Sequence, residues 1–469
     1  MTKSGALVLA AYSLAALVPC PAYGQESPRA GDPLSAPARE ETSGLPDGVR
    51  FSGSIRPRYE TLANQFVAGR TGGDEVLNIR TLLKLEVDAG PLTFVGELLD
   101  SRLLFGNDGG GASGVVDAIE PIQLYAQWSQ RDAFAPAASL RLKAGRFAMD
   151  VGSRRLTARS NFGSTVQSFD GVQAAWTSAD DLKVSAFAVR PTTRAPSDSP
   201  SELDNEIAFN PDLSNISFTA LHIDSPLPHD TRGEIYVFAL NERDASDTPS
   251  RNRDLLTVGG RLRRQRAPDA FDFDLEYAHQ TGTLRASASP LDVTDLNHEA
   301  SMLHAEVGRT LDMAWSPRLS LLYDFASGDG SPLDARSGRF DSLFGDRSFE
   351  LGPTSIWGAL SRNNLSSAGI RLEVAPDTES DALVMLRHVE LAEASDRFGN
   401  TGVVDPTGAS GKEVGQQLEV RYRRWLAKDA LRLAVGAAAL FEGSFLKNAP
   451  NATDQGDAYY GYTELTWVF

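Results

Sequence analysis

The chain has 469 residues, of which 41% are hydrophobic, and it carries a net charge of −17 and one cysteine, Cys20. After the N-terminus no window approaches the 18 or more consecutive apolar residues of a membrane helix, which excludes a helical membrane protein. The negative charge argues against nucleic acid as a partner. A mean hydropathy of −0.25 suits either a soluble all-β protein or a transmembrane β-barrel.

Residues 1–24 are typical of a secretory signal peptide. Lys3 lies in a short basic start, an apolar run extends to Val18, and residues 22–24 form a small-x-small cleavage site. Cleavage there removes the single cysteine, so we expect no disulfide and no thiol chemistry in the mature chain. Residues 25–49 are rich in Pro, Ala and Glu without periodicity, which predicts a flexible periplasmic segment too short for a folded plug domain.

From residue 50 to residue 469, segments of alternating apolar and polar residues follow one another almost without interruption. In a β-strand alternate side chains point to opposite faces, and about 9–11 residues let a tilted strand cross a bilayer. This pattern predicts about eighteen strands, near residues 50–60, 76–88, 92–102, 119–129, 138–147, 169–178, 181–190, 216–224, 233–241, 255–263, 270–280, 300–310, 317–326, 366–374, 380–388, 414–424, 430–440 and 457–469.

The connections between these strands alternate between long and short. The short ones include 89–91, 178–180, 375–379 and 426–429. Such alternation is typical of extracellular loops and periplasmic turns. It favours an all-β, antiparallel, up-and-down barrel in the Gram-negative outer membrane, formed by residues 50–469. The long connections are 61–75, 103–118, 148–168, 191–215, 242–254, 281–299, 327–365, 389–413 and 441–456.

The last strand indicates how the barrel closes. Leu465, Trp467 and Phe469 share one face, while Glu464 and Thr466 share the other. A closing strand needs an apolar, aromatic lipid face and must pair with the first strand. We expect the barrel-assembly machinery to recognise this strand, and outer-membrane lipid and lipopolysaccharide to surround the barrel. The alternative is the C-terminal strand of a soluble β-sandwich.

Within the strands, apolar and charged residues separate onto two faces. Leu83 and Leu85 lie opposite Arg80 and Lys84, and Ile122 falls on the same apolar face as Leu124, Ala126 and Trp128. Eighteen strands enclose a lumen too wide for side chains to fill, so such an interior holds water. The charged face is therefore predicted to point inward and the apolar face to contact lipid.

The inward face carries many arginines together with acidic residues. Rings of Arg and Lys select for anions, and a guanidinium forms bidentate bonds to carboxylate or phosphate. The pattern therefore favours a passive channel with a basic or mixed-charge constriction that passes anionic solutes; alternatively, cross-strand Arg–Glu pairs only stiffen the wall. The arginines predicted from the strand pattern to line the pore are Arg56, Arg58, Arg80, Arg371, Arg421 and Arg423, and their acidic partners include Glu60, Glu86, Asp272, Asp274, Glu276, Glu373 and Glu419.

Three groups of short motifs resemble the alginate-export family of outer-membrane channels. They are residues 144–147 (Ala-Gly-Arg-Phe) with 152–156 and 168–172, residues 324–329 with 340–344, and residues 443–447 ahead of the terminal strand.

The resemblance implies an eighteen-stranded monomer with an arginine-rich pore through which an anionic polysaccharide such as alginate leaves the cell. It implies that Arg146, either Arg154 or Arg155, and Asp170 belong to the pore constriction. The family prototype has a long periplasmic turn late in the chain that acts as a plug, whereas the turn at 425–429 is short here. A general or uptake porin for small acidic solutes is therefore the alternative.

Other kinds of site have weaker support. The six histidines show no metal-ligand spacing, and no nucleophile elbow or phosphate-binding loop is present, so we expect no cofactor and no enzyme. An outer-membrane barrel enzyme would have to use His304 or His388 with a nearby acid. A structural or adhesive barrel is a third possibility, which a blocked lumen would favour. A group of aspartates is either a calcium site or a solvated acidic loop: Asp324, Asp329, Asp334, Asp341 and Asp346.

Overall fold

A computed structural model of the chain describes residues 45–106, 114–244 and 250–469. The expected signal peptide (residues 1–24) and most of the expected periplasmic segment (residues 25–49) lie outside the described residues. No helix in these three ranges is long and apolar enough to cross a membrane, since α1 (Ser199–Leu203) and α2 (Ser444–Asn448) have five residues each.

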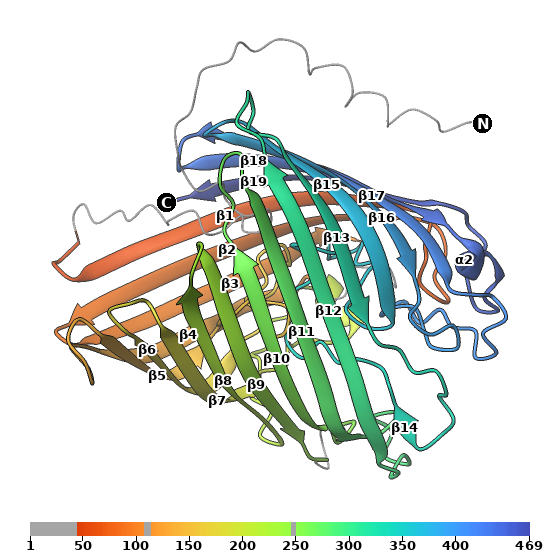
Figure 1. Cartoon of the computed structure of the whole chain (residues 1–469), viewed down its shortest axis with the longest axis horizontal. Helices are drawn as coiled ribbons and strands as arrows, with labels where there is room; N and C mark the ends of the chain where they lie inside the picture. Colours follow the sequence, from red (N-terminus) through yellow and green to blue (C-terminus); the bar gives the residue numbers. More distant parts are fainter. Residues whose placement is uncertain (1–44, 107–113, 245–249) are drawn as a thin grey trace.

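The described residues form one closed antiparallel sheet of eighteen long strands (Figure 1). All eighteen predicted strands are confirmed, and most are longer at one or both ends than the alternation indicated. A two-residue strand, β14 (Arg336–Ser337), pairs with β12 in parallel. The eighteen strands are β1 (Val49–Ala63), β2 (Asp74–Ala89), β3 (Leu92–Phe105), β4 (Asp117–Arg131), β5 (Ser139–Phe147), β6 (Phe169–Thr177), β7 (Lys183–Pro191), β8 (Ile216–Leu227), β9 (Thr231–Glu242), β10 (Asp254–Arg264), β11 (Phe271–Leu284), β12 (Leu296–Thr310), β13 (Arg318–Ala326), β15 (Leu365–Asp377), β16 (Ser380–Glu390), β17 (Glu413–Ala427), β18 (Leu431–Glu442) and β19 (Ala458–Val468).

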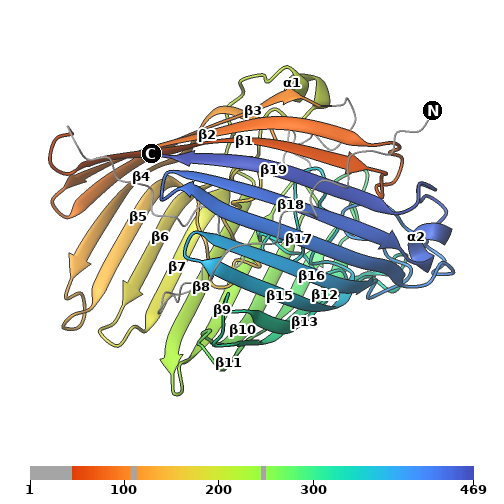
Figure 2. The same ribbon diagram turned by 90° about the horizontal axis from the view of Figure 1, so that it is seen from above.

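The last strand pairs with the first, so no long strand is left with a free edge. β19 runs antiparallel to β1, from Ser54 opposite Val468 to Ala63 opposite Tyr459, and Figure 2 shows the two strands side by side. The backbones of Gly53 and Phe469 exchange two hydrogen bonds of 2.7 and 3.0 Å. Closure satisfies the backbone groups that lipid cannot hydrogen-bond.

Apolar wall residues face outward and charged wall residues face the lumen, as the sequence alternation predicts. Leu85 and Trp467 point outward and are 45% and 51% exposed, whereas Arg56 and Arg80 point inward and are 1% exposed. The long side chains on the inner face are buried because parts of the chain fill the lumen. An apolar exterior around a charged interior is the pattern of a barrel that sits in lipid.

One predicted face was wrong. Ile122 is fully buried inside the barrel together with Leu82 and Leu99, instead of lying outside with Leu124. The register between β3 and β4 shifts after Glu97 opposite Gln123, so Ile122 is the extra residue of a β-bulge. A bulge places two successive residues against one partner and interrupts strict alternation, which a period of two cannot show.

Deleting Phe469 is expected to lower the yield of folded barrel. The change removes both backbone hydrogen bonds to Gly53 and the ring contacts with Trp467 (5.0 Å) and Phe51 (6.2 Å). We expect a loss of stability of about 2–4 kcal/mol. The folded fraction can be measured from the shifted mobility of unheated samples on denaturing gels. Phe209→Ala, which truncates a loop aromatic that is 66% exposed, is the control. Equal folded fractions for both variants would show that the terminal residue does not contribute to closure.

Gly145 is a second position where the wall depends on one residue type. Its φ is +128°, and a Cβ there would lie 2.4 Å from the Leu124 carbonyl oxygen and 2.8 Å from the Tyr125 Cα. Gly145→Ala is therefore expected to destabilise the barrel by about 1–3 kcal/mol, measured by urea unfolding in detergent micelles. Gly96→Ala is the matched control, because a Cβ at Gly96 meets nothing within 4 Å. If both variants unfolded at the same urea concentration, the backbone at Gly145 would not be strained.

Two connections fold into the barrel instead of standing above it. We call residues 148–168 the first lumen loop and residues 327–364 the second lumen loop. Figure 1 shows loop segments inside the ring of strands. The loops pair with each other: Phe344 N donates to the Leu156 carbonyl and Ala158 N donates to the Phe344 carbonyl, both at 3.0 Å.

The second lumen loop is also fixed to the wall. Ser355 donates to Glu60 on β1, and Gln417 on β17 donates to the Leu351 carbonyl. The two loops therefore narrow the lumen from inside.

Candidate functional site

The inner wall has one face on which arginines outnumber carboxylates. Six arginines from β1, β2, β17 and β18 lie here, and only two carboxylates, Glu464 of β19 and Asp381 of β16, are within salt-bridge distance of them. Glu60 of β1 and Glu419 of β17 lie near the same arginines beyond salt-bridge distance, so the excess is two positive charges. We call the six residues the arginine face: Arg56, Arg58, Arg80, Arg421, Arg423 and Arg432.

The six guanidinium groups differ in how closely they approach a carboxylate. Arg58 donates to Glu464 at 2.9 and 2.5 Å, while Arg56 and Arg432 approach the same carboxylate at 3.5 and 3.9 Å. Arg80 has no carboxylate within 4.0 Å among the described residues. The buried nitrogens without a hydrogen-bond partner in the described part of the chain include Arg80 Nε and Nη2, Arg56 Nε, Arg421 Nε and both Nε and Nη2 of Arg432. These N–H groups are buried donors that no acceptor in the described residues satisfies.

A small cavity of about 30 Å³ lies at the centre of the arginine face. Its walls include Arg58, Arg421, Arg423 and Arg432, with Tyr462 closing one side. A space of this size holds a water molecule. The cavity lies between these wall residues and Phe162 and Ser348 of the two lumen loops.

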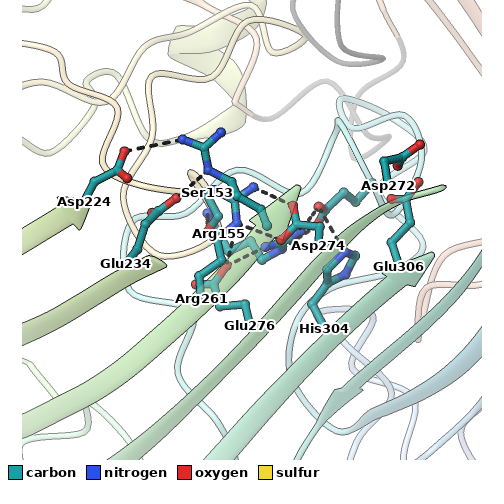
Figure 3. Close-up of polar contacts among 12 residues, drawn as sticks. Ser153, Arg155, Asp224, Glu234, Arg261, Asp272, Asp274, Glu276, His304 and Glu306 are labelled. Atoms are coloured by element: carbon teal, nitrogen blue, oxygen red, sulfur yellow. Dashed lines mark hydrogen bonds and ion pairs between the residues drawn. The ribbon is translucent and has the colours of Figure 1, made fainter. Parts of the chain in front are cut away.

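The opposite side of the barrel is acidic. Six carboxylates from β8, β9, β11 and β12 face four strand arginines there, and Figure 3 shows several of them turned toward Arg155 and Arg261. Arg261 bonds Glu234 and Asp274, and Arg318 bonds Asp272, Glu306 and Glu373. We call the carboxylates the acidic face: Asp224, Glu234, Asp272, Asp274, Glu276 and Glu306. Every arginine on this side is matched by two or more carboxylates.

The two faces lie on opposite sides of the lumen. β10, in the middle of the acidic face, is nine strand positions from β1 in either direction, through β2–β9 on one side and through β11–β13 and β15–β19 on the other. The sequence predicted a basic or mixed-charge constriction, and in the structure the arginine excess and most of the paired carboxylates lie on different sides of the lumen. Opposite charges on facing walls produce a field across the lumen, and low-dielectric walls concentrate it.

The first lumen loop crosses between these faces. On the acidic side, Arg155 of this loop donates to Glu276 on β11 at 2.5 Å and to Glu350 of the second lumen loop at 3.0 Å. On the opposite side, the backbone carbonyls of Asn161, Phe162 and Gly163 accept hydrogen bonds from the arginine face. The loop thus contacts the acidic face with a cation and the arginine face with carbonyl oxygens.

Arg155 and Glu350 join both lumen loops to the wall. Glu350 also pairs with Arg362, and its carbonyl accepts from Arg387 on β16 at 3.0 Å. Burial alone would lower the pKa of the Arg155 guanidinium, but Glu350, Asp274 and Glu276 raise it well above its ordinary value. Burial alone would raise the pKa of the Glu350 carboxyl, but Arg155, His304 and Arg362 hold it well below its usual range. Both groups are therefore charged at neutral pH.

Five of the predicted site residues come together on the arginine face: Arg56, Arg58, Arg80, Arg421 and Arg423. The remaining arginines lie elsewhere. Arg155 faces the acidic side, Arg371 pairs with Glu306 at 3.5 Å, and the Arg154 guanidinium lies over the Phe349 ring at 4.6 Å. The structure therefore brings together the arginines found from strand pattern on β1, β2 and β17, but not those that the resemblance placed at a constriction.

Arg146 and Asp170 form a pair at the extracellular rim. They are direct partners across β5 and β6, joined by two hydrogen bonds of 2.8 Å, and Arg146 also bonds Glu120 at 2.7 Å. The neighbours Phe147 and Phe169 point inward and are fully buried, while Leu124, which pairs with Arg146, is 67% exposed. Alternation therefore places Arg146 and Asp170 on the outer row, away from the arginine face.

Arg432 is the member of the arginine face that was not singled out from sequence. It was visible as the one charged residue between Leu431 and Phe441, a stretch that is otherwise apolar. An isolated charge opposite an unbroken lipid-facing row must point into the lumen. Glu464 carries the same signal in the last strand.

The remaining candidates have partners within the chain. His304 Nδ1 lies 2.7 Å from Asp324. Its Nε2 has no hydrogen-bond partner in the described part of the chain, so no serine hydroxyl there is bonded to it as a nucleophile would be. His304, Asp324 and Glu350 would be close enough to hold a metal ion, but Arg387, Arg155 and Arg362 already bond the two carboxylates. His388 is half-exposed on the outer face, 3.5 Å from Glu390.

The aspartates between 324 and 346 do not gather into one site. Asp341 bonds Arg253 at 2.8 Å, and Asp346 caps the backbone of Ser348 at 2.8 Å, while Asp324 belongs to the His304 pair. Residues 330–336, which include Asp334, are exposed as the expected solvated loop, whereas Asp341 and Asp346 are folded against the wall and the lumen loops.

The closed eighteen-stranded barrel, with a lipid-type exterior and a charged lumen, defines an outer-membrane channel protein of Gram-negative bacteria. The sequence profile of the family described as "Alginate export" matches residues 48–458, which is most of the chain, and the chain belongs to that family. No functionally curated protein matches it significantly.

Solved structures share the fold at low sequence identity. Pseudomonas aeruginosa OccK8 (OprE) is 12% identical with a TM-score of 0.57, over 90% of this chain and 98% of that one. Pseudomonas aeruginosa OpdL is 9% identical with a TM-score of 0.56, over 90% and 98%. Pseudomonas aeruginosa OccK11 (OpdR) is 13% identical with a TM-score of 0.54, over 89% and 96%.

Proposed function

We propose that this protein is a monomeric channel that passes anions along its arginine face and that its substrate is an anionic polysaccharide such as alginate, which leaves the cell. The observation that carries the proposal is the excess of six arginines over four carboxylates on that face, with buried N–H groups that have no hydrogen-bond partner among the described residues. Guanidinium groups bind carboxylates through paired hydrogen bonds, and a polyuronate presents one carboxylate per sugar. The family membership supports the same substrate class.

The route is confined to one side of the lumen. On the acidic face, the arginines are already bonded to carboxylates, so an incoming anion gains no free donor there and meets carboxylates of its own charge. A polyanion is therefore expected to pass along β1, β2, β17 and β18. Arg146 and Asp170, which lie on the outer row, are not part of the proposed route.

Interruption of ion current by an oligouronate tests the substrate class. Wild-type protein in planar bilayers should show brief current blockades when a short oligouronate is added on the periplasmic side. A neutral oligosaccharide of equal length should produce far fewer. Equal blockade by both sugars would contradict a carboxylate-binding route.

The alternative is a porin for small acidic solutes. It is favoured by the narrowing of the lumen by two loops, which leaves little room for a polymer in this conformation. Liposome swelling distinguishes the two: rapid entry of small carboxylates with no blockade by oligouronate would favour the porin.

The structural or adhesive barrel is favoured by the same loops. A barrel that carries no ion current at all, in wild type and in variants with weakened loop contacts, would favour this third function over both channel functions.

A further inference from the structure

Three consecutive carbonyl groups of the first lumen loop are bound by three arginines of the wall. Arg56 donates to the Asn161 carbonyl at 2.8 Å and to the Gly163 carbonyl at 3.0 Å. Arg80 donates to the Gly163 carbonyl at 2.8 Å, and Arg58 donates to the Phe162 carbonyl at 2.6 Å. All three guanidinium groups are buried, with side chains about 1% exposed. The loop therefore occupies the donors that an anion would use.

The carbonyl groups are poor partners for these cations. A carbonyl oxygen is neutral overall, whereas a hydrogen bond between two charged groups is roughly twice as strong as one between neutral groups. Arg80 has no carboxylate within reach, and its Nε and Nη2 bond nothing among the described residues. A buried guanidinium with only neutral partners remains partly uncompensated. A carboxylate or phosphate would supply both the charge and the missing acceptors.

The loop has a second attachment at this point. The Arg58 guanidinium lies over the Phe162 ring at 4.0 Å, and that ring meets Tyr462 edge-on at 5.3 Å. A cation–π contact at a buried site contributes modestly compared with a paired carboxylate. Phe162 therefore fills the space beside the arginine face without satisfying its charge.

Residues 155–159 and residues 161–163 of the loop are held in different ways. Arg155 is bound to the acidic face and to Glu350 by several charged hydrogen bonds, and Arg159 is bound to Glu97 of β3 at 2.8 and 2.7 Å. Residues 161–163 are bound to the arginine face through neutral atoms and one ring, and an anion competes for this attachment only. The charged attachments keep the rest of the loop inside the lumen when residues 161–163 are released.

We propose that residues 160–164 act as a displaceable internal ligand, which an anionic substrate removes from Arg56, Arg58 and Arg80 as it binds, so that the substrate opens its own route. This regulation rests on the proposed function, because it requires an anion on the arginine face. Because binding of the anion and attachment of the loop exclude each other, the fraction of barrels with a released loop increases as more barrels bind an anion.

Thiol accessibility at Ser164 measures the release. The only cysteine of the chain, Cys20, lies in the expected signal peptide, so Ser164→Cys introduces a single thiol in the mature barrel. Ser164 is 1% exposed and its hydroxyl has no hydrogen-bond partner in the described part of the chain, so the substitution is conservative. Ser320→Cys, on β13, is the matched control, because Ser320 is equally buried and also unpartnered but belongs to the wall.

A charged methanethiosulfonate reagent should modify Cys at position 164 slowly in the protein alone and at least about fivefold faster with a short oligouronate. A neutral oligosaccharide should have no effect, and the thiol at position 320 should not respond to either sugar. In a Ser164→Cys, Arg80→Gln protein, modification should already be fast without oligouronate, because two bonds to the loop are lost.

The outcomes separate this inference from the function on which it rests. Oligouronate blockade of the current with an unchanged rate at position 164 would overturn the internal-ligand role and leave the channel function standing. Neither blockade nor a rate change would overturn both. A rate increase at both thiol positions would indicate general loosening of the barrel and would also overturn the proposal.

Discussion

Arg155→Met is expected to raise the single-channel conductance about twofold or more, because it frees both lumen loops from the acidic face. Arg155 contacts Glu276 of the wall and Glu350 of the second lumen loop. Removing one partner of a buried ion pair costs about 3–5 kcal/mol, since the remaining charges are left without compensation. The loops should then leave the lumen for a larger fraction of the time. Recordings in planar bilayers at fixed salt provide the measurement.

Gly345→Ala tests the same loops without changing any charge. A Cβ at Gly345 would lie 1.8 Å from the Arg155 carbonyl oxygen, so the backbone pairing between the two loops must open. Gly330→Ala in the same loop is the matched control, because its Cβ would make only an ordinary 3.4 Å contact with Glu393. If Arg155→Met and Gly345→Ala both left the conductance at the value of the control, the loops would not limit the current.

Neutralising three members of the arginine face is expected to lower the ratio of anion to cation permeability about threefold or more. The triple variant is Arg80→Gln, Arg421→Gln and Arg432→Gln. It leaves Glu464 paired with Arg58 and Asp381 paired with Arg423, so no carboxylate loses its last arginine. The excess of two positive charges becomes a deficit of one, and the attraction for anions falls with it.

The matched control replaces the same three residues with lysine. Lysine keeps the charge but loses the planar donor pair, so ion selectivity should be retained while oligouronate blockade weakens. Reversal potentials in a salt gradient measure the selectivity of each variant. Unchanged selectivity in the glutamine variant would show that anions do not pass along this face.

The number of strands and their facing could be predicted because each wall residue faces either lipid or the lumen. That constraint produces a period of two, and it is why Leu85, Trp467 and Arg80 were placed correctly. It fails where the backbone departs from the pattern, as at Ile122, which a bulge turns inward. Arg146 and Asp170 were placed by resemblance to a motif, which carries no information about which row of the wall they occupy.

The contents of the lumen could not be predicted. The position of Arg155 depends on contacts between residues far apart in sequence, such as Glu276 and Glu350. The separation of an arginine face from an acidic face is a property of the closed ring, since the two faces come from strands nine positions apart. Strand pattern identified the inward charges but did not show which of them were left unmatched.

The reversal potential of the wild-type channel tests the central claim most directly. With a tenfold gradient of potassium chloride across a planar bilayer, an excess of arginine N–H donors along one wall predicts a potential of the sign set by chloride permeation. A reversal potential of the opposite sign, set by potassium, would contradict an anion route along the arginine face.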